Sequence, residues 1–168
     1  MIRGMTELAV LELTGASLRI RRAVAADVPR MVALMRDDPV GATRDGLLGA
    51  VDLTPFLAAF AAIDANPSAL LVVGEVDGLV VGMAQLTVLQ SLGRGGVRRG
   101  EVESVRVAAD WHGRGVGTAI LRWVCDEARR RGCVLAQLTS DKRRVDAIRF
   151  YEQFGFHATH EGLKLIFD

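Results

Sequence analysis

The chain has 168 residues, half of them hydrophobic and 24% charged, with a formal net charge of +1. A chain of this kind buries enough surface to fold as one soluble domain, spanning residues 1–168, without help from a disulfide or a metal. The balanced charge excludes the strong field that recruits nucleic acid, and no apolar run approaches the roughly 20 residues of a membrane span.

In the first half of the chain, apolar spacing and cap residues predict a series of strands and helices. Residues 8–13 leave two alternatives open, an extra strand or a loose arm. Asp27, and Thr54 followed by Pro55, are typical of helix N-termini, and Asp77-Gly78 between two β-branched runs predicts a hairpin. The expected elements are a strand at 18–21, helices at 27–37 and 54–66, and strands at 70–76 and 79–89.

The second half predicts further strands and helices after residues 91–100, a stretch with four glycines that we expect to be a loop. The expected elements are a strand at 102–108, a helix closed by Gly132, a strand at 134–138, a helix at 142–154 and a strand at 163–167, with a short strand at 156–159 left open. Val102 differs in parity from Val105 and Val107, so we expect a β-bulge near Glu103 or Ser104. The fold class is α/β (α+β), with a mixed sheet whose first half is antiparallel and with flanking helices.

A glycine-rich turn at residues 112–118 leads from the strand at 102–108 into the next helix. The free N–H groups and the dipole of a helix start favour an anion, and glycine lets the backbone approach it closely. The turn is therefore a candidate phosphate or pyrophosphate site. It lacks the Gly-Lys-Ser/Thr of a Walker loop and the glycine spacing of a dinucleotide fold. Alternate glycines alone also fit a purely structural turn.

This turn resembles the acetyl-CoA-binding motif of the GNAT superfamily of N-acetyltransferases, in which Arg or Gln precedes Gly-x-Gly or Gly-x-Ala by two residues. Gly115 and Gly117 match the motif's glycines, and His112 stands in place of Arg or Gln. Further along, Asp146-Ala147-x-x-Phe150-Tyr151, with Gly155-Phe156 after it, resembles the signature of the superfamily's last helix. The resemblance implies the GNAT fold, with splayed strands at an acetyl-CoA cleft. It also implies transfer of acetyl to a primary amine by direct attack in a ternary complex.

The resemblance also implies roles for individual residues. Tyr151 is expected to protonate the leaving thiolate, and a backbone N–H near Val107 to stabilise the oxyanion. Glu103 is the candidate base, with Glu101 or water alone as alternatives. Tyr151 as a packing aromatic and Glu103 as a solvent-facing glutamate are the competing structural interpretations. The expected acetyl-CoA contacts are Val105, Arg106, Val107, His112, Gly113, Arg114, Gly115, Val116, Gly117, Thr118, Ser140, Arg144, Asp146, Ala147 and Phe150.

The acceptor is expected to be a small-molecule or peptide amine, held by residues 37–50, the second helix and residues 91–100. The carboxylates of these segments favour a cationic acceptor; they are Asp37, Asp38 and Asp45. The arginines, Arg98 and Arg99, favour an anionic one. Two other functions stay open, an acetyl-CoA sensor without catalysis, suggested by His112, and a nucleotide-binding module without transferase activity. Neither nucleic acid nor a membrane is expected as a partner, and the resemblance admits a homodimer.

The cysteines Cys125 and Cys133 lack the spacing of metal ligands and lie in apolar stretches. We expect them to be reduced core residues, with no bound metal. Residues 1–14 lack the layout of a signal peptide, which favours a cytoplasmic protein.

Overall fold

The structure is a computed structural model that describes residues 6–44 and 46–167, built around a sheet whose strands follow the order of the sequence. The strands are β1 (Glu7–Leu13), β2 (Ala16–Arg22), β3 (Ala69–Val76), β4 (Leu79–Gln90), β5 (Arg98–Val107) and β6 (Cys133–Gln137). Neighbours are antiparallel as far as β5, and β6 runs parallel to β5. This confirms the mixed sheet with an antiparallel first half, and β1 shows that residues 8–13 form a strand.

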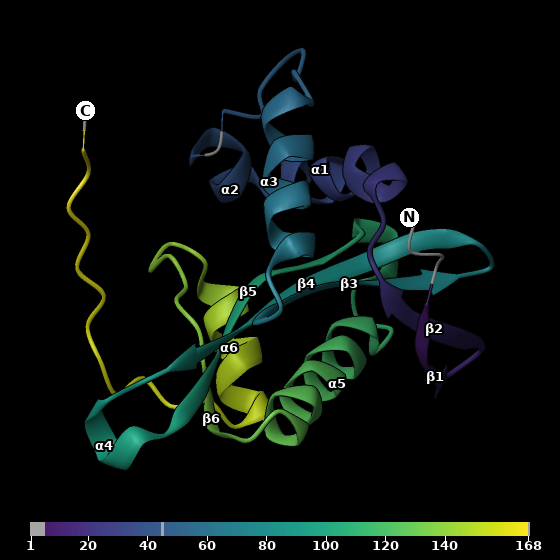
Figure 1. The fold of residues 1–168 in the computed structure, drawn as a ribbon. Coiled ribbons are helices and arrows are strands. Elements are labelled where there is room, and N and C mark those ends of the chain that lie inside the picture. Colours follow the sequence, from purple (N-terminus) through teal and green to yellow (C-terminus); the bar gives the residue numbers. More distant parts are fainter. Residues whose placement is uncertain (1–5, 45, 168) are drawn as a thin grey trace.

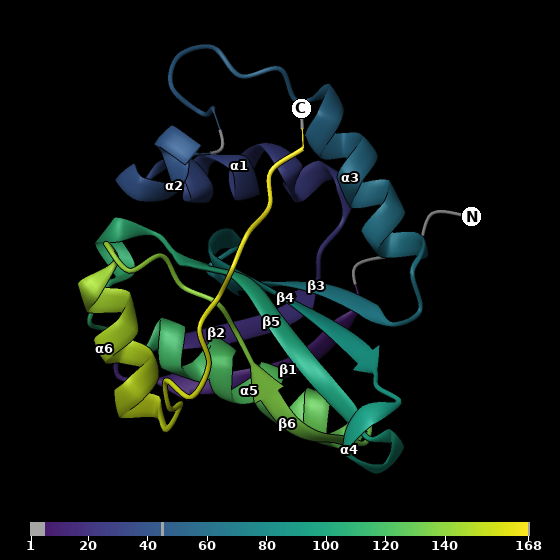
Figure 2. The same ribbon diagram turned by 90° about the vertical axis from the view of Figure 1, so that its left-hand side faces the viewer.

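Helices cover both faces of the sheet (Figures 1 and 2). The helices α1 (Val28–Arg36), α2 (Pro39–Arg44) and α3 (Thr54–Ala65) lie on one face, and α5 (Val116–Arg130) and α6 (Val145–Phe154) lie on the other. Short turns of helix, η1 (Ala25–Asp27), α4 (Gly93–Gly96) and η2 (Ala109–Trp111), join the larger elements. Each face has its own apolar core, because the strands of a sheet covered on both sides bury side chains in both directions.

Two glycines let α5 lie close against the middle of the sheet. A Cβ at Gly82 would stand 2.6 Å from Cδ1 of Ile120, and a Cβ at Gly74 would stand 2.9 Å from the same atom. Ile120, fully buried, therefore fills the space that side chains on β3 and β4 would otherwise occupy. This close packing fixes the start of α5 relative to the end of β5.

Two sequence predictions are wrong at the ends of strands. Residues 91–100 are not all loop, since Arg98 and Arg99 already pair with Gln90 and Leu89, and only the glycine tip departs from the hairpin. Neither residues 163–167 nor residues 156–159 form a strand, and the segment runs extended beside the body of the molecule without a neighbouring strand (Figures 1 and 2). A strand needs a partner edge, and its apolar side chains, such as Phe167 at 84% exposure, gain no burial here.

Asp27 is the N-cap residue of α1, as predicted, whereas the N-cap residue of α3 is Leu53 and not Thr54. The α3 helix follows Leu53, and the N–H of Thr54 is bound by the Asp52 carboxylate. Asp27 precedes α1, but its carboxylate accepts from the N–H of Val24 and from the Arg21 guanidinium. Among the described residues, no helix combines the length and the apolar character that crossing a membrane requires.

Candidate active site

The glycine turn delivers the chain from the end of β5 into α5 with the amides of the first helical turn unpaired within the helix. Gly113 and Gly115 have φ angles of +72° and +83°, a conformation that glycine adopts without strain. The first intrahelical bond runs from the N–H of Ala119 to the carbonyl of Gly115, at 2.9 Å. The N–H groups of residues 116–118 are therefore left for another acceptor, at the positive end of the helix dipole.

Gly117 holds this helix start against two other elements of the site. A Cβ there would meet Cγ2 of Val107 at 3.4 Å and the ring of Phe150 at 3.5 Å. These are ordinary van der Waals distances, so the first turn of α5 packs closely between the end of β5 and α6. Three residues expected at the cofactor, Val107, Gly117 and Phe150, therefore lie together although they are far apart in the sequence.

A gap between β5 and β6 opens beside this helix start. The two strands pair only from Arg98 to Glu101 on β5, and β6 ends at Gln137 while β5 continues to Val107. The N–H of Ala108 donates to the carbonyl of Val81, so the neighbouring pair Gly82–Val107 is not hydrogen-bonded across the strands. The N–H of Val107 therefore faces away from β4, toward the side on which β6 has diverged.

The predicted β-bulge is present on β5. The register with β4 shifts between Glu103 and Arg106, and Ser104 has a φ of +52°. The bulge reconciles the two parities, because Val102 on one side of it and Val105 and Val107 on the other all contact the core under α5. It also frees backbone groups of β5 at the point where the gap begins.

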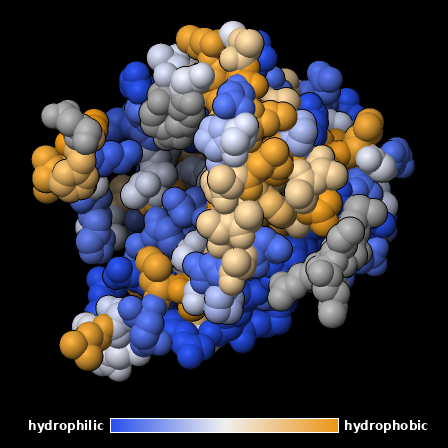
Figure 3. All heavy atoms as spheres, turned by 45° about the horizontal axis from the view of Figure 1, so that its top comes forward, coloured by the Kyte–Doolittle hydropathy of each residue, from blue (hydrophilic) through white to orange (hydrophobic). Residues whose placement is uncertain are grey.

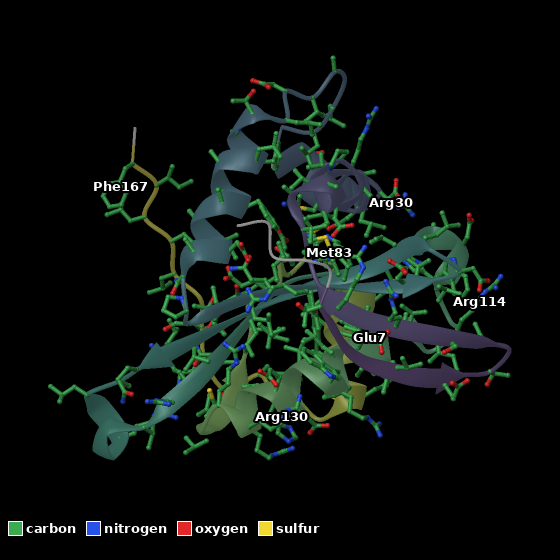
Figure 4. All side chains as sticks on the ribbon, turned by 45° about the vertical axis from the view of Figure 1, so that its right-hand side comes forward. Glu7, Arg30, Met83, Arg114, Arg130 and Phe167 are labelled. Carbon is green, nitrogen blue, oxygen red and sulfur yellow. The ribbon has the colours of Figure 1, made fainter. Side chains whose placement is uncertain are left out.

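His112 ties the turn to the strand. Its Nε2 lies 2.9 Å from the carbonyl oxygen of Val107, so a proton on Nε2 donates to that carbonyl. This role needs no ligand, and it explains how the turn keeps its shape without Arg or Gln at this position. Arg114 stacks over the Trp111 ring, at 5.0 Å from its centroid, and points outward from the turn (Figure 4).

Tyr151 lies on α6 with its ring buried against Phe150 and Phe156, and only 8% of the residue is exposed. Burial raises the pKa of its phenol above the ordinary value of 10, although Arg144 and Arg106 act in the opposite direction. The phenol therefore stays protonated at neutral pH and remains a hydrogen-bond donor. Within the described residues, its hydroxyl makes no hydrogen bond.

Two arginines expected at the cofactor meet on one carboxylate. Arg106 Nη2 on β5 and Arg144 Nη2 just before α6 each lie 3.3 Å from Oδ2 of Asp38, which follows α1. All three side chains are largely buried, with Arg106 at 9% exposure. The same charges act on the Tyr151 phenol. This charged cluster of Asp38, Arg106 and Arg144 therefore borders the tyrosine.

Glu103 and Glu101 lie on the sheet face opposite α5. Glu103 is exposed and accepts a 3.4 Å bond from Nε2 of Gln85, while Glu101 accepts a 2.6 Å bond from Nε2 of Gln137 on β6. Arg106 shares this face, because it pairs with Met83, which lies under α1 (Figure 4). Of the other acidic candidates, Asp37 is exposed and Asp45 lies outside the described residues.

Comparison with known proteins decides the family. The sequence model of the Acetyltransferase (GNAT) family matches residues 31–156. The chain belongs to the GNAT family.

Two curated relatives and one solved structure are similar to this GNAT chain. Glucosamine 6-phosphate N-acetyltransferase of Trypanosoma brucei brucei is 33% identical over 91 residues, which are 54% of this chain and 60% of that protein. Aminoalkylphosphonate N-acetyltransferase of Salmonella typhimurium is 34% identical over 61 residues, 36% of this chain and 40% of that protein. A crystal structure described as a transcriptional regulator from Bacillus halodurans C-125 has a TM-score of 0.82 and 37% identity, covering 89% of this chain and 99% of that one.

The remaining residues expected at acetyl-CoA in this GNAT chain divide between the gap and the surface. Ser140 has a buried hydroxyl without a hydrogen-bond partner among the described residues. Because buried polar groups are normally hydrogen-bonded, this hydroxyl suits a contact with a polar ligand. Ala147 and Phe150 pack against the core under α5. Asp146 is fully exposed and forms an ion pair of 3.7 Å with Arg149, so its side chain faces solvent.

A groove of about 390 Å³ runs between α5 and α6 from the glycine turn. Thr118 and Phe150 line it, together with Arg122, Cys125, Asp126, Arg129, Gln153 and Phe154. Arg122 was missed by the sequence analysis, although its position four residues after Thr118 places it on the same helix face. The groove, the unpaired amides and the Ser140 hydroxyl fit a long ligand with a phosphate-containing end, which is the chemistry of coenzyme A.

Proposed function

We propose that this chain is an acetyl-CoA-dependent N-acetyltransferase that transfers acetyl to a primary amine by direct attack in a ternary complex. The observation that carries the proposal is the packing of the α5 start against Val107 and Phe150, with the buried Tyr151 in the same core, beside the gap between β5 and β6. Bound acetyl-CoA supplies the activated thioester. Residues 113–118 and Ser140 would hold it, and Arg122 would add a cation beside the groove.

Each proton in this reaction has a candidate residue. The amine loses its proton to Glu103, directly or through water, as its nitrogen forms the new N–C bond. The Val107 N–H donates to the carbonyl oxygen, which gains negative charge as the nitrogen attacks and gives it up when C=O re-forms and the C–S bond breaks. Tyr151 donates its phenolic proton to the departing sulfur, which suits a group that stays protonated at neutral pH.

The cysteines support direct attack over an acyl-enzyme. Burial raises the pKa of the Cys125 thiol and that of the Cys133 thiol, so both are poor sources of thiolate. Both cysteines also pack with the core under α5, away from the face that carries Glu103. Cys125 also lines the groove proposed for coenzyme A, so the raised pKa of its thiol is what argues against an acyl-enzyme there.

The acceptor is proposed to be a small-molecule amine. Both curated relatives are named for such amines, and both names include a phosphorus oxyanion, as phosphate or phosphonate. A second candidate function, an acetyl-CoA-binding regulator without turnover, is favoured by the description of the Bacillus halodurans structure as a transcriptional regulator.

Acetyl-CoA binding tests what the two candidates share. At 100 times Kd, acetyl-CoA should stabilise the chain by about 2.7 kcal/mol, which differential scanning calorimetry measures. Gly117→Val fills the space between Val107 and Phe150 and should abolish this stabilisation. Gly162→Val is the control, because a Cβ at Gly162 meets nothing within 4 Å. A chain that acetyl-CoA does not stabilise would contradict both functions.

Turnover then separates the enzyme from the regulator. Release of free CoA thiol is measured with amino-sugar phosphates, aminoalkylphosphonates, aminoglycosides, polyamines and peptide N-termini. Thiol release that depends on one class of amine supports the transferase. Stabilisation by acetyl-CoA with no release from any amine would overturn the transferase and leave the regulator.

A further inference from the structure

We propose that residues 162–167, the C-terminal arm, pair with the free edge of β6 in a second copy of this chain, and that two copies exchange their arms in this way. The chain carries both an exposed apolar segment without a strand partner and a sheet edge without a neighbouring strand. This inference concerns assembly and does not depend on the proposed transferase function.

The C-terminal arm exposes apolar side chains that the described part of the chain leaves uncovered. Its four large apolar residues are 79% to 94% exposed: Leu163, Leu165, Ile166 and Phe167. The arm stands out at the left of Figure 3, and in Figure 4 Phe167 points away from the helices and the sheet. Single exposed apolar residues are ordinary, but four in a run of five mark an interaction surface.

The chain is fixed just before the arm, and the arm itself is free to pair. The N–H of Phe156 donates to the carbonyl of Tyr151 at 2.9 Å, and their rings are in contact. Glu161 accepts a 3.1 Å bond from Nζ of Lys142. Beyond Glu161, residues 162–167 make no hydrogen bond or ion pair within the described structure. Their backbone donors and acceptors are therefore available to another strand.

β6 offers an edge that suits this arm. It is the last strand of the sheet, paired with β5 alone among the described strands. Edges that stay unpaired usually carry charged side chains or proline, and the five residues of β6 include neither. Val134 on β6 is 64% exposed. β1, at the other edge, carries Glu7 and Glu12 and is protected in the usual way.

The arm and β6 lie near each other on one chain, which favours exchange in both directions. Lys142, in the loop after β6, binds Glu161, the residue before the arm. The arm then leads away from its own β6, toward the end of the molecule that carries α2 and α3 (Figures 1 and 2). A two-fold interface uses the same patch on both copies, so one axis beside this region places each arm on the partner's β6. β1 lies at the opposite edge of the sheet.

Two exchanged arms bury enough surface for a stable dimer. Burying one leucine, isoleucine or phenylalanine side chain removes on the order of 100 Å² from water. Two arms with four such side chains each, together with the surfaces that they cover, bury on the order of 1,600 Å². This is the size of a standard specific interface. Backbone hydrogen bonds along β6 add affinity, as in other cases of strand addition.

Analytical ultracentrifugation of the full chain tests the dimer and its two contact surfaces. The wild type should sediment at micromolar concentration as a dimer, with twice the chain mass of 18.1 kDa. Leu165→Asp should raise the dimer Kd about 100-fold or more, because each of the two arms loses an apolar contact that contributes about tenfold. Val134→Lys should also weaken the dimer, since lysine protects an edge. A wild type that is monomeric at every concentration would overturn the proposal.

Leu79→Asp is the matched control for Leu165→Asp. Leu79 is 69% exposed and lies at the β3–β4 turn, at the end of β4 away from the part that pairs with β5 next to β6. Both leucines are exposed in the single chain, so neither change should alter the circular dichroism spectrum. Leu79→Asp should leave the Kd unchanged. Equal weakening by the two changes would show a general effect of charge and overturn the role of the arm.

An equal mixture of Leu165→Asp and Val134→Lys tests the exchange itself. A homodimer of either variant has two damaged contacts, whereas the mixed dimer keeps one intact arm on one intact β6. Its other contact carries both changes, but a second change at a broken contact costs little, and the two introduced charges are opposite. The mixture should therefore dimerise up to about 10-fold more tightly than either variant alone. No gain in the mixture would show that arm and β6 do not meet between copies.

Hydrogen exchange at two protein concentrations separates the partner's edge from the chain's own edge. Amides of residues 163–167 should exchange slowly in the dimer and rapidly after dilution to the monomer. Slow exchange that persists on dilution would show that the arm pairs within its own chain, and would overturn the exchange. Rapid exchange in a chain that is still dimeric would place the interface elsewhere, with the same consequence.

Discussion

At the scale of single residues, Tyr151 carries the clearest prediction. Tyr151→Phe removes the hydroxyl and keeps the ring that packs on Phe150 and Phe156. We expect kcat to fall about 100-fold or more, the usual contribution of a general acid, with little change in KM for acetyl-CoA. Thiol-release kinetics at saturating acetyl-CoA measure both. A variant as fast as the wild type would remove Tyr151 from the mechanism.

The pH dependence of the same residue has a definite sign. Burial raises the pKa of the Tyr151 phenol above 10, and the protonated form is the one that donates. The wild-type rate should therefore lose this contribution only as pH rises through that pKa. Tyr151→Phe should lack this alkaline limb. A limb that persists in the variant would belong to another group.

Residue-level reasoning succeeded where local chemistry decides the outcome. The bulge followed from the parity of three valines, and the turn followed from its glycines, because both depend on backbone geometry within a few residues. The bond from His112 to the Val107 carbonyl was not foreseen, since it requires the folded turn. The cluster on Asp38 was missed for the same reason. Its partners are distant in sequence, and the sequence marked Asp38 only as one of three acidic residues near the acceptor.

At the scale of elements, a buried ion network joins β2, η1 and β3. Arg21 is 3% exposed and binds both carboxylate oxygens of Asp27, at 2.7 and 2.8 Å, and Glu75 at 2.8 Å. Asp27→Asn leaves the buried guanidinium with one carboxylate and should cost about 3 kcal/mol in the free energy of unfolding. Glu161→Gln, at an exposed ion pair with Lys142, should cost less than about 1 kcal/mol. Urea unfolding measures both, and similar values for the two variants would contradict the prediction.

This network also gives the stability a pH dependence. Burial of Asp27 opposes its ionisation, but the bonds from Arg21 and from the Val24 N–H outweigh burial and lower its pKa. The stabilisation is therefore complete above the unfolded pKa of about 3.9 and is lost as pH falls through the lower folded value. The difference between wild type and Asp27→Asn should shrink below about pH 4.

Sequence reasoning about elements failed where pairing partners decide. Residues 163–167 are mostly apolar, as a buried strand is, yet apolar character gives no partner edge, and Leu163 is 94% exposed. The prediction that residues 91–100 form a loop failed in the opposite direction, because residues 98–100 belong to β5. Their glycines suggested a loop, but Gln90 binds the Gly96 carbonyl at 2.7 Å and Arg98 at 3.2 Å, which extends the hairpin nearly to its tip.

At the scale of the whole molecule, the sheet separates two sides with different tasks. The α5–α6 side holds the glycine turn, the groove and the larger core, and the α1–α3 side holds Glu103 and the charged cluster. The gap between β5 and β6 connects the two faces of the sheet, because the two strands are not paired there. This division is why a cofactor and an acceptor could approach the Val107 N–H from opposite faces.

The division predicts where acetyl-CoA should slow hydrogen exchange. Amides of residues 105–120 and 138–150 surround the proposed cofactor site, and their exchange should slow by up to about 100-fold at 100 times Kd. The α3 helix lies on the other face of the sheet, away from that site, and should keep its rates (Figure 1). Residues 157–161 serve as the internal reference, since the described structure gives their amides no backbone hydrogen bonds. Mass spectrometry of peptides with and without acetyl-CoA makes the comparison. Slowing confined to the α1–α3 side would place the cofactor on the wrong face and contradict the assignment of both sides.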